Sequence, residues 1–298
     1  MPLSNHVKAD LLLVLTTLLA AAGWIFSKEA LAGLAPLLFI AMRFSSAGLL
    51  VASFRLGSLK ALSAEQWRAS LKVGMLFGVA MVFWILGLHL STHLGVGAFL
   101  TSLGVVMVPL MGLFFGERPG RYVFYSLPFV ASGLACLSLD TEFSIGLGEM
   151  SFLTAALFFS LTFILNSRAS ARIPTVPLTA IQLVLAGIIT FVVSIFTETW
   201  NFDQPMAIWG WFLASTLIAT SLRFSIQTRA QGLAPASHAA IIMTLEPVWA
   251  ALMAAWWLGE QMSPMQIAGC SMIFLAMLVN RWPAVRYWVR NVGRGGIR

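Results

Sequence analysis

The sequence is poor in charged residues. Of its 298 residues, 10% are charged and 59% are hydrophobic, and the mean hydropathy is +0.88. A soluble domain uses roughly a quarter of its residues as charged groups to cover its surface. The shortage therefore excludes a water-soluble globular protein and predicts a chain whose solvent is the lipid bilayer.

Cysteine and histidine are scarce as well, with two and four copies. Cys136 and Cys270 lie inside apolar runs, where small core residues are expected and not a disulfide or a metal site. His89 and His93 have the i, i+4 spacing of a metal pair, but no carboxylate is near them in the sequence. His238 is expected to form a hydrogen bond at the membrane interface, with gating by protonation as the alternative. We expect no metal and no cofactor, and the missing P-loop pattern G-x-x-x-x-G-K-S/T excludes ATP as the direct energy source.

What the chain does contain is long apolar runs. A helix needs about 20 mainly apolar residues to cross the hydrocarbon core of a bilayer. Runs of about this length occupy residues 8–27, 36–55, 69–89, 96–115, 121–139, 148–167, 177–197, 206–228, 237–258 and 264–282. Because they are continuously apolar and do not alternate, they favour helices over a β-barrel. We predict an all-α integral membrane protein with ten transmembrane helices.

The basic residues gather on one side of the predicted membrane. Lys and Arg are enriched in cytoplasmic segments, and a cytoplasmic N-terminus puts most of the 18 basic residues inside. The inner segments then carry Lys8, Arg55, Lys60, Arg68, Lys72, Arg118, Arg121, Arg168, Arg172, Arg229 and the arginines from Arg281 onward. The sequence therefore predicts two cytoplasmic termini. This topology explains the net charge of +7 without a nucleic-acid partner.

An internal repeat relates the two ends of the chain. Displacing the sequence against itself superimposes several identical residues: Gly116 on Gly259, Glu117 on Glu260, and Thr101 on Thr244. The repeat contains five spans, and this odd number makes the two halves insert in opposite orientations. We predict an inverted repeat of residues 1–142 and 143–298, the second half ending in a basic cytoplasmic tail. Such halves can exchange conformations, which is the basis of alternating access.

Short motifs at matching places in the spans carry a resemblance to a known family. They are Gly23-Trp24, Lys28, Pro36, Arg43, Gly116-Glu117, Leu245-Glu246-Pro247 and Gly259-Glu260. Together with the number of spans, they make the chain similar to the drug/metabolite transporter superfamily, in its ten-span branch with two EamA-type repeats. It most resembles the bacterial exporters of aromatic and other neutral amino acids. The first repeat departs from the pattern, because Leu103-Gly104 stands where the second has Glu246-Pro247.

The resemblance implies a secondary transporter in the inner membrane of a bacterial cell. It implies export of small amphipathic metabolites from the cytoplasm through a central cavity lined by spans 1, 3, 4, 6, 8 and 9. We expect a small-molecule substrate and the lipid bilayer as partners, for a monomer or a weak homodimer, while proton coupling stays open. A multidrug or other metabolite exporter of the same superfamily is the first alternative. A membrane-embedded enzyme or a channel is the second, although no nucleophile–base pair supports an enzyme.

Three ionisable residues lie inside predicted spans, where a charge is costly unless it faces protein or water. Glu246 is near the middle of the ninth span, and the following Pro247 removes a backbone donor and allows a kink. Arg223 lies in the cytoplasmic half of the eighth span, where it either holds a substrate carboxylate or pairs with Glu246. Arg43, in the second span, is expected to stabilise the fold by contacts with backbone carbonyls.

Aromatic and small polar residues complete the predicted site. Aromatic side chains on spans 1, 3 and 6 would form an amphipathic pocket for apolar or aromatic substrates, although most aromatics in such a chain pack on lipid or on other helices. The residues predicted to bind substrate are Trp24, Phe83, Trp84, Thr101, Ser102, Phe163, Ser221, Arg223, Met243 and Glu246. No catalytic residue is predicted.

Overall fold

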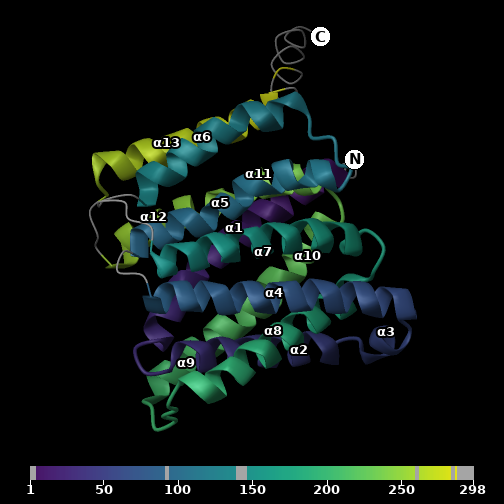
Figure 1. Cartoon of the computed structure of the whole chain (residues 1–298), viewed down its shortest axis with the longest axis vertical. Helices are drawn as coiled ribbons and strands as arrows, with labels where there is room; N and C mark the ends of the chain where they lie inside the picture. The colour runs from purple at the N-terminus through teal and green to yellow at the C-terminus, as the bar shows by residue number, and fades with distance from the viewer. Residues whose placement is uncertain (1–4, 91–93, 139–145, 259–261, 283–285, 287–298) are drawn as a thin grey trace, which may run out of the picture.

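The computed structural model describes residues 5–90, 94–138, 146–258, 262–282 and 286, and all regular secondary structure in them is helical (Figure 1). The elements are α1 (Asn5–Ala30), α2 (Pro36–Ser53), α3 (Leu56–Lys60), α4 (Ala64–Leu90), α5 (Leu94–Phe114), α6 (Arg121–Ser138), α7 (Leu147–Ser170), α8 (Thr175–Thr197), α9 (Met206–Thr216), η1 (Leu217–Leu222), α10 (Arg223–Gln231), α11 (Ala236–Met243), α12 (Leu245–Leu258) and α13 (Pro264–Asn280). The predicted boundary between residues 142 and 143, His93, the pair Gly259-Glu260 and most of the basic tail lie outside the described residues.

Seven helical stretches in the described part of the chain are long and apolar enough to cross a bilayer. They are Val7–Ala30, Pro36–Ser53, Ala64–Leu90, Leu147–Ser170, Thr175–Thr197, Met206–Gln231 and Ala236–Trp257. Three shorter apolar helices occupy the predicted fourth, fifth and tenth spans: Phe99–Phe114, Arg121–Leu137 and Pro264–Asn280. The prediction of an all-α membrane protein with ten transmembrane helices is therefore confirmed.

The helices pack mainly across the two predicted halves (Figure 1). α2 lies along α8, α4 lies along α7 and α8, and α6 lies along α13, while α1 contacts α9 to α12. Where α6 meets α13, a Cβ added to Gly133 would lie 2.9 Å from the Gly269 carbonyl oxygen, and one added to Gly269 would lie 2.7 Å from that of Gly133. Glycine at both positions lets the two backbones touch.

Two of the spans are interrupted near their middle. The eighth span consists of α9, the π-helical turn η1 and α10. The ninth span consists of α11 and α12, which are separated at Thr244. Pro247 lacks the N–H that would bond to the carbonyl of Met243, and this loss accounts for the break. The interruption at Thr244 thus lies where the sequence predicts a kink.

The end of the bundle where α1 begins is closed by apolar side chains. Residues of α1, α10 and α11 form a buried cluster of Leu13, Ala230, Ala239, Ile242 and Met243. α11 is buried along nearly its whole length. We call this end of the bundle, where the cluster packs, the closed end.

Polar side chains tie the start of α1 to the end of α13 at the same place. Asp10 Oδ1 lies 2.9 Å from His238 Nε2, and Asn280 Nδ2 lies 3.1 Å from His238 Nδ1. Arg281 forms an ion pair with Asp10. The start of α1 and the end of α13 therefore lie at one end of the bundle, the end that the charge pattern predicts to be cytoplasmic.

Candidate functional site

Three side chains from distant parts of the chain meet in the middle of the bundle. Glu246, near the start of α12, accepts a hydrogen bond from Trp24 Nε1 of α1 through Oε1, at 3.2 Å. Its Oε2 lies 3.5 Å from a terminal guanidinium nitrogen of Arg223, the first residue of α10. We call Trp24, Arg223 and Glu246 the central cluster. It joins the first, eighth and ninth spans.

The ion pair of the central cluster is partly exposed. The side chains of Arg223 and Glu246 are 15% and 25% exposed. The guanidinium carbon lies 4.3 Å from the centroid of the Phe224 ring, a cation–π contact. Arg223 Nε has no hydrogen-bond partner among the described residues. A guanidinium presents five N–H donors in a fork that matches a carboxylate, and this buried Nε–H is a donor that the described surroundings leave unused.

Two of the predicted aromatic residues lie at the central cluster. The side chain of Trp24 is half exposed, and its ring meets that of Trp84 on α4 edge-on, with 6.4 Å between centroids. Phe83 stacks on Phe158 of α7 at 5.9 Å. Phe163 packs against the apolar residues around α11. The structure thus brings Trp84 to the ion pair through Trp24, and gives Phe83 and Phe163 other packing partners.

The remaining predicted residues occupy varied places. Ser221 lies in η1 and donates to the Thr216 carbonyl at 2.9 Å, within its own span. Met243 is buried in the apolar cluster at the closed end. Thr101 and Ser102 are half-buried on α5, and the hydroxyl oxygen of Thr101 has no partner in the part of the chain that the structure describes. Of these four residues, Thr101 has a hydroxyl group without a hydrogen-bond partner in the described residues.

Arg43 reaches the middle of the bundle from α2. The predicted contact with a backbone carbonyl is present, since its guanidinium donates to the Ala219 oxygen at 3.3 Å. The hydroxyls of Ser27 and Thr220 also accept from it, and the sequence did not indicate these partners. The sequence signal that could have indicated these two hydroxyls is their distance along the chain. Each stands three residues from a residue of the central cluster.

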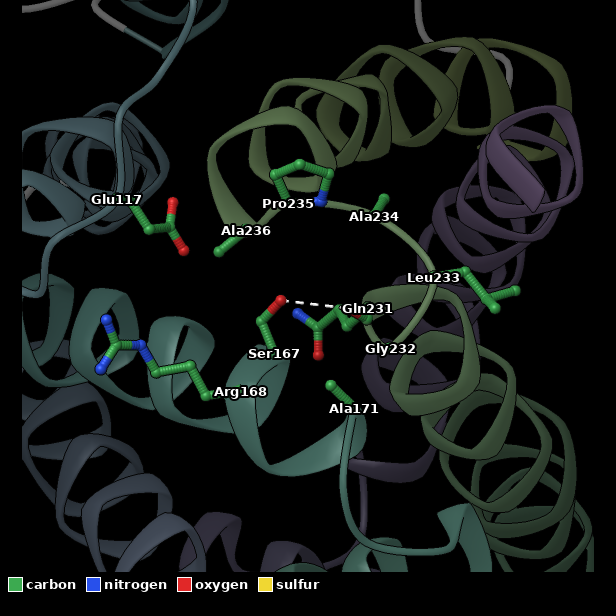
Figure 2. Close-up of a pocket in the computed structure, with 10 residues that line it drawn as sticks. All are labelled: Glu117, Ser167, Arg168, Ala171, Gln231, Gly232, Leu233, Ala234, Pro235 and Ala236. Atoms are coloured by element: carbon green, nitrogen blue, oxygen red, sulfur yellow. Dashed lines mark hydrogen bonds between the residues drawn. The ribbon is translucent and has the colours of Figure 1, made fainter.

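A second polar site lies at the closed end of the bundle (Figure 2). It is a pocket of ≈ 320 Å³ lined by Glu117, Ser167, Arg168, Ala171, Gln231, Gly232, Leu233, Ala234, Pro235 and Ala236. Ser237 donates to Glu117 at 2.8 Å, which ties the start of α11 to the segment after α5. Ser167 donates to the Gln231 carbonyl at 3.1 Å, which ties α7 to α10 (Figure 2). These bonds add polar contacts to the apolar packing that closes this end.

The histidines of the described residues lie apart from any larger group of possible metal ligands. No group of three or more His, Cys, Asp or Glu side chains is placed there to hold a metal ion. His89 is exposed at the end of α4. The hydrogen bond predicted for His238 is present, since its ring bonds Asp10 and Asn280. His238 therefore links α1, α11 and α13.

Apolar helices with an ion pair inside them define a polytopic membrane protein with a polar centre. The model of the EamA-like transporter family matches residues 7–139 and again residues 146–282. The chain belongs to the EamA-like transporter family, which confirms the resemblance to the drug/metabolite transporter superfamily. It is a membrane transporter of small metabolites and not an enzyme.

Two individual proteins are similar to the chain along nearly its whole length. An uncharacterized transporter from Archaeoglobus fulgidus is 28% identical over 280 residues, covering 92% of this chain and 86% of the relative. A solved structure, described as the crystal structure of a protein, has a TM-score of 0.82 at 18% sequence identity and covers 94% of this chain and 99% of its own. The second similarity shows the fold alone.

Proposed function

We propose that the protein exports small zwitterions, above all aromatic and other neutral amino acids, from the cytoplasm by alternating access. The observation that carries the proposal is the Arg223–Glu246 pair with Trp24 beside it. An α-amino acid holds a carboxylate and an ammonium group close together. Its carboxylate can therefore replace Glu246 as the partner of Arg223, and its ammonium group can replace Arg223 as the partner of Glu246. An apolar or aromatic side chain then packs on the indoles of Trp24 and Trp84.

The geometry of the ion pair suits this exchange. Charge-assisted N–H···O bonds are about 2.7–2.9 Å long, whereas Arg223 and Glu246 are 3.5 Å apart. A substrate carboxylate can bind the Arg223 fork through two bonds while its ammonium group binds Glu246. No charge is then left unpaired with or without substrate. Because an unpaired buried charge is strongly destabilising, this compensation favours both loading and release.

Export requires the closed end of the bundle to open. Because the termini are predicted to be cytoplasmic, the substrate would enter at the end of the bundle where α1 begins. At this end α11 is buried and Ser237 donates to Glu117. A rearrangement of the two halves around the central cluster would open this end and close the other, as inverted repeats allow. In this proposal the present arrangement is the state in which the central cluster is shut off from the cytoplasm.

Export of hydrophobic cations is the second candidate function. Glu246 with the indoles of Trp24 and Trp84 would also hold such a cation, because aromatic faces attract positive charge. The guanidinium of Arg223 opposes this, since it repels a cation bound to its own partner. Competition separates the two candidates: zwitterions should displace the substrate, and hydrophobic cations should not.

Counterflow in proteoliposomes tests the proposal. A labelled neutral amino acid such as phenylalanine should show saturable counterflow, and Arg223→Gln and Glu246→Gln should each reduce it at least about tenfold, because hydrogen bonds between charged groups are lost. Arg55→Gln and Glu65→Gln remove exposed charges outside the cluster and should keep full counterflow. Unsaturable flux would favour a channel, and full counterflow in both cluster variants would refute the assigned roles.

A further inference from the structure

Arg43 is held by partners on two other helices, and all three of its guanidinium nitrogens take part. Nε donates to the Thr220 hydroxyl, one terminal nitrogen donates to Ser27 Oγ at 2.9 Å, and the other donates to the Ala219 carbonyl at 3.3 Å. The guanidinium also lies within 6 Å of two phenylalanine rings of its own helix, at 5.7 and 5.8 Å. Ser27 belongs to α1, whereas Ala219 and Thr220 belong to η1. One side chain of α2 therefore joins the first span to the eighth.

Both hydroxyl partners stand three residues from a residue of the central cluster. Ser27 follows Trp24 by three residues on α1, a spacing that makes them neighbours on the surface of an α-helix. Thr220 precedes Arg223 by three residues and is connected to it through the π-helical turn η1. Trp24 and Arg223 both bond to Glu246. Arg43 therefore contacts both segments, α1 and η1, that position the partners of the Glu246 carboxylate.

The segment held on the eighth span is a π-helical turn, η1. Residues Leu217–Leu222 form this turn, and the hydroxyls of Thr220 and Ser221 each donate to a backbone carbonyl five residues earlier, at 2.9 Å, which follows the i to i+5 spacing of a π-helix. A π turn contains one residue more than an α turn, and successive residues of a helix are about 100° apart around its axis. If η1 relaxed to an α turn, Arg223 would rotate away from Glu246 by about that angle. The orientation of Arg223 therefore depends on keeping the turn in its π form.

A glycine lets α1 approach this turn. A Cβ added to Gly23 would lie 2.6 Å from the Ala219 Cβ and 3.6 Å from a guanidinium nitrogen of Arg43. Small residues at a helix crossing allow backbones to come this close. Gly23 thereby makes it possible for Ser27 and η1 to share one guanidinium.

We propose that Arg43 is a positioning residue of the transport site. By joining η1 to α1, a link that we call the clamp, Arg43 sets the rotation of Arg223 and the position of Trp24, which lie on either side of Glu246. Arg43 itself does not contact the substrate. The inference rests on the proposed function of the Arg223–Glu246 pair. It gives Arg43 a role beyond the fold-stabilising contact that the sequence predicts, because both elements that it joins supply a residue of the central cluster.

A double-mutant cycle on the Kd of a neutral amino acid, measured calorimetrically on the purified full-length protein, tests the clamp. Thr220→Val removes the hydroxyl that Arg43 holds, together with that hydroxyl's own bond to the Ser215 carbonyl, while keeping the shape of the side chain. We expect it to raise the Kd about tenfold, mainly through loss of the hydrogen bond to the charged group. In an Arg223→Lys background the same substitution should change the Kd less than about twofold. A lysine is a flexible point charge whose binding does not depend on a fixed fork, and coupled residues are non-additive.

Two matched variants control for general loosening of the span. Thr216→Val removes a hydroxyl that is buried in the same span and donates to the Phe212 carbonyl at 2.9 Å, and it should leave the Kd within about twofold of the parent. Thr220→Ser keeps the hydroxyl and should restore binding. Arg43→Lys, which cannot engage the three partners at once, should weaken binding in the same direction as Thr220→Val.

The outcomes separate this inference from the function on which it rests. Equal losses from Thr220→Val in the two backgrounds, or an equal loss in Thr216→Val, would overturn the clamp while leaving the Arg223–Glu246 site intact. Unchanged binding in Arg223→Lys and Arg223→Gln would instead refute the proposed role of the pair. Melting temperatures of all variants show whether each protein is folded before its Kd is compared.

Discussion

At the residue scale, the described side chains at the centre of the bundle carry more positive than negative charge. Arg43 is close enough to Arg223 and Glu246 to interact with the charges of both. Two guanidinium groups therefore act on one carboxylate. Because charges interact more strongly away from bulk water, this balance favours a ligand that brings a carboxylate over one that brings only a cation.

Substrate analogues should therefore compete in an order set by their charge. Phenethylamine, which is phenylalanine without its carboxylate, should have an inhibition constant at least about tenfold higher than that of phenylalanine, because it loses the bonds to Arg223 and is repelled by both guanidinium groups. N-acetylphenylalanine keeps the carboxylate and should lose less. Competition against counterflow of a labelled amino acid measures both constants. The reverse order would mean that Glu246 dominates recognition.

Sequence could single out the charged residues but not their contacts. Glu246 and Arg223 stand out because a charge within an apolar run is rare and costly. Trp24 and Glu246 are 222 positions apart, and no local pattern carries information over such a distance. Met243, also predicted as a site residue, stands three residues before Glu246 but packs into the apolar cluster at the closed end.

At the element scale, both charged residues of the cluster stand where a helix restarts. Arg223 follows η1, and Glu246 follows the break at Thr244. Interrupted helices supply free backbone groups and bends at binding sites of many transporters. Pro247 signals the second interruption in the sequence. The first has no such signal, because the serine and threonine residues of a π turn are equally common in ordinary membrane helices.

Replacing Pro247 by alanine should straighten the ninth span. The restored N–H can donate to the carbonyl of Met243 and join α11 to α12. Proline inside a helix costs about 3 kcal/mol, so we expect a higher melting temperature together with a turnover reduced several-fold. Pro128→Ala in α6, whose helix is continuous, should stabilise without slowing transport. An unchanged turnover in Pro247→Ala would show that the break is not needed for the transport cycle.

Enlarging Gly133 should act on stability and not on substrate binding. An added Cβ would meet Ile273 at 2.8 Å and the Gly269 carbonyl at 2.9 Å, so Gly133→Ala must push α6 from α13, at a cost of about 1–3 kcal/mol. The melting temperature in detergent should fall while the Kd stays unchanged. Gly120→Ala is the control, since an added Cβ there meets nothing within 4 Å. A weaker Kd in Gly133→Ala would connect this crossing to the site.

At the scale of the whole molecule, hydropathy predicted the ten spans well because each must be apolar along its length. The ends differ by a few residues: the first span was predicted at 8–27, and α1 extends over Asn5–Ala30. A helix continues into the polar interface, where composition no longer marks it. The side on which the termini lie and the limits of the two halves remain predictions from charge and repeat.

Locking the closed end should arrest the proposed export. Glu117→Cys and Ser237→Cys, placed where the native side chains are hydrogen-bonded, can be bridged by a short bifunctional methanethiosulfonate in a protein whose Cys136 and Cys270 are alanine. We expect transport to be lost on bridging and regained on reduction, because opening this end separates α11 from the segment after α5. Each single cysteine variant treated in the same way is the control. Continued transport after complete bridging would place the moving gate elsewhere.

The packing of α2 on α8, α4 on α7 and α6 on α13 has a consequence for how the protein is made. While the ribosome has released only the first five spans, the faces that α2, α4 and α6 will bury are still facing lipid, because their partners have not been synthesised. Maturation therefore waits for the second half of the chain. Residues 1–142 produced alone should be degraded, and co-production with residues 143–298 as a separate chain should rescue them, as blotting of membranes for both fragments would reveal.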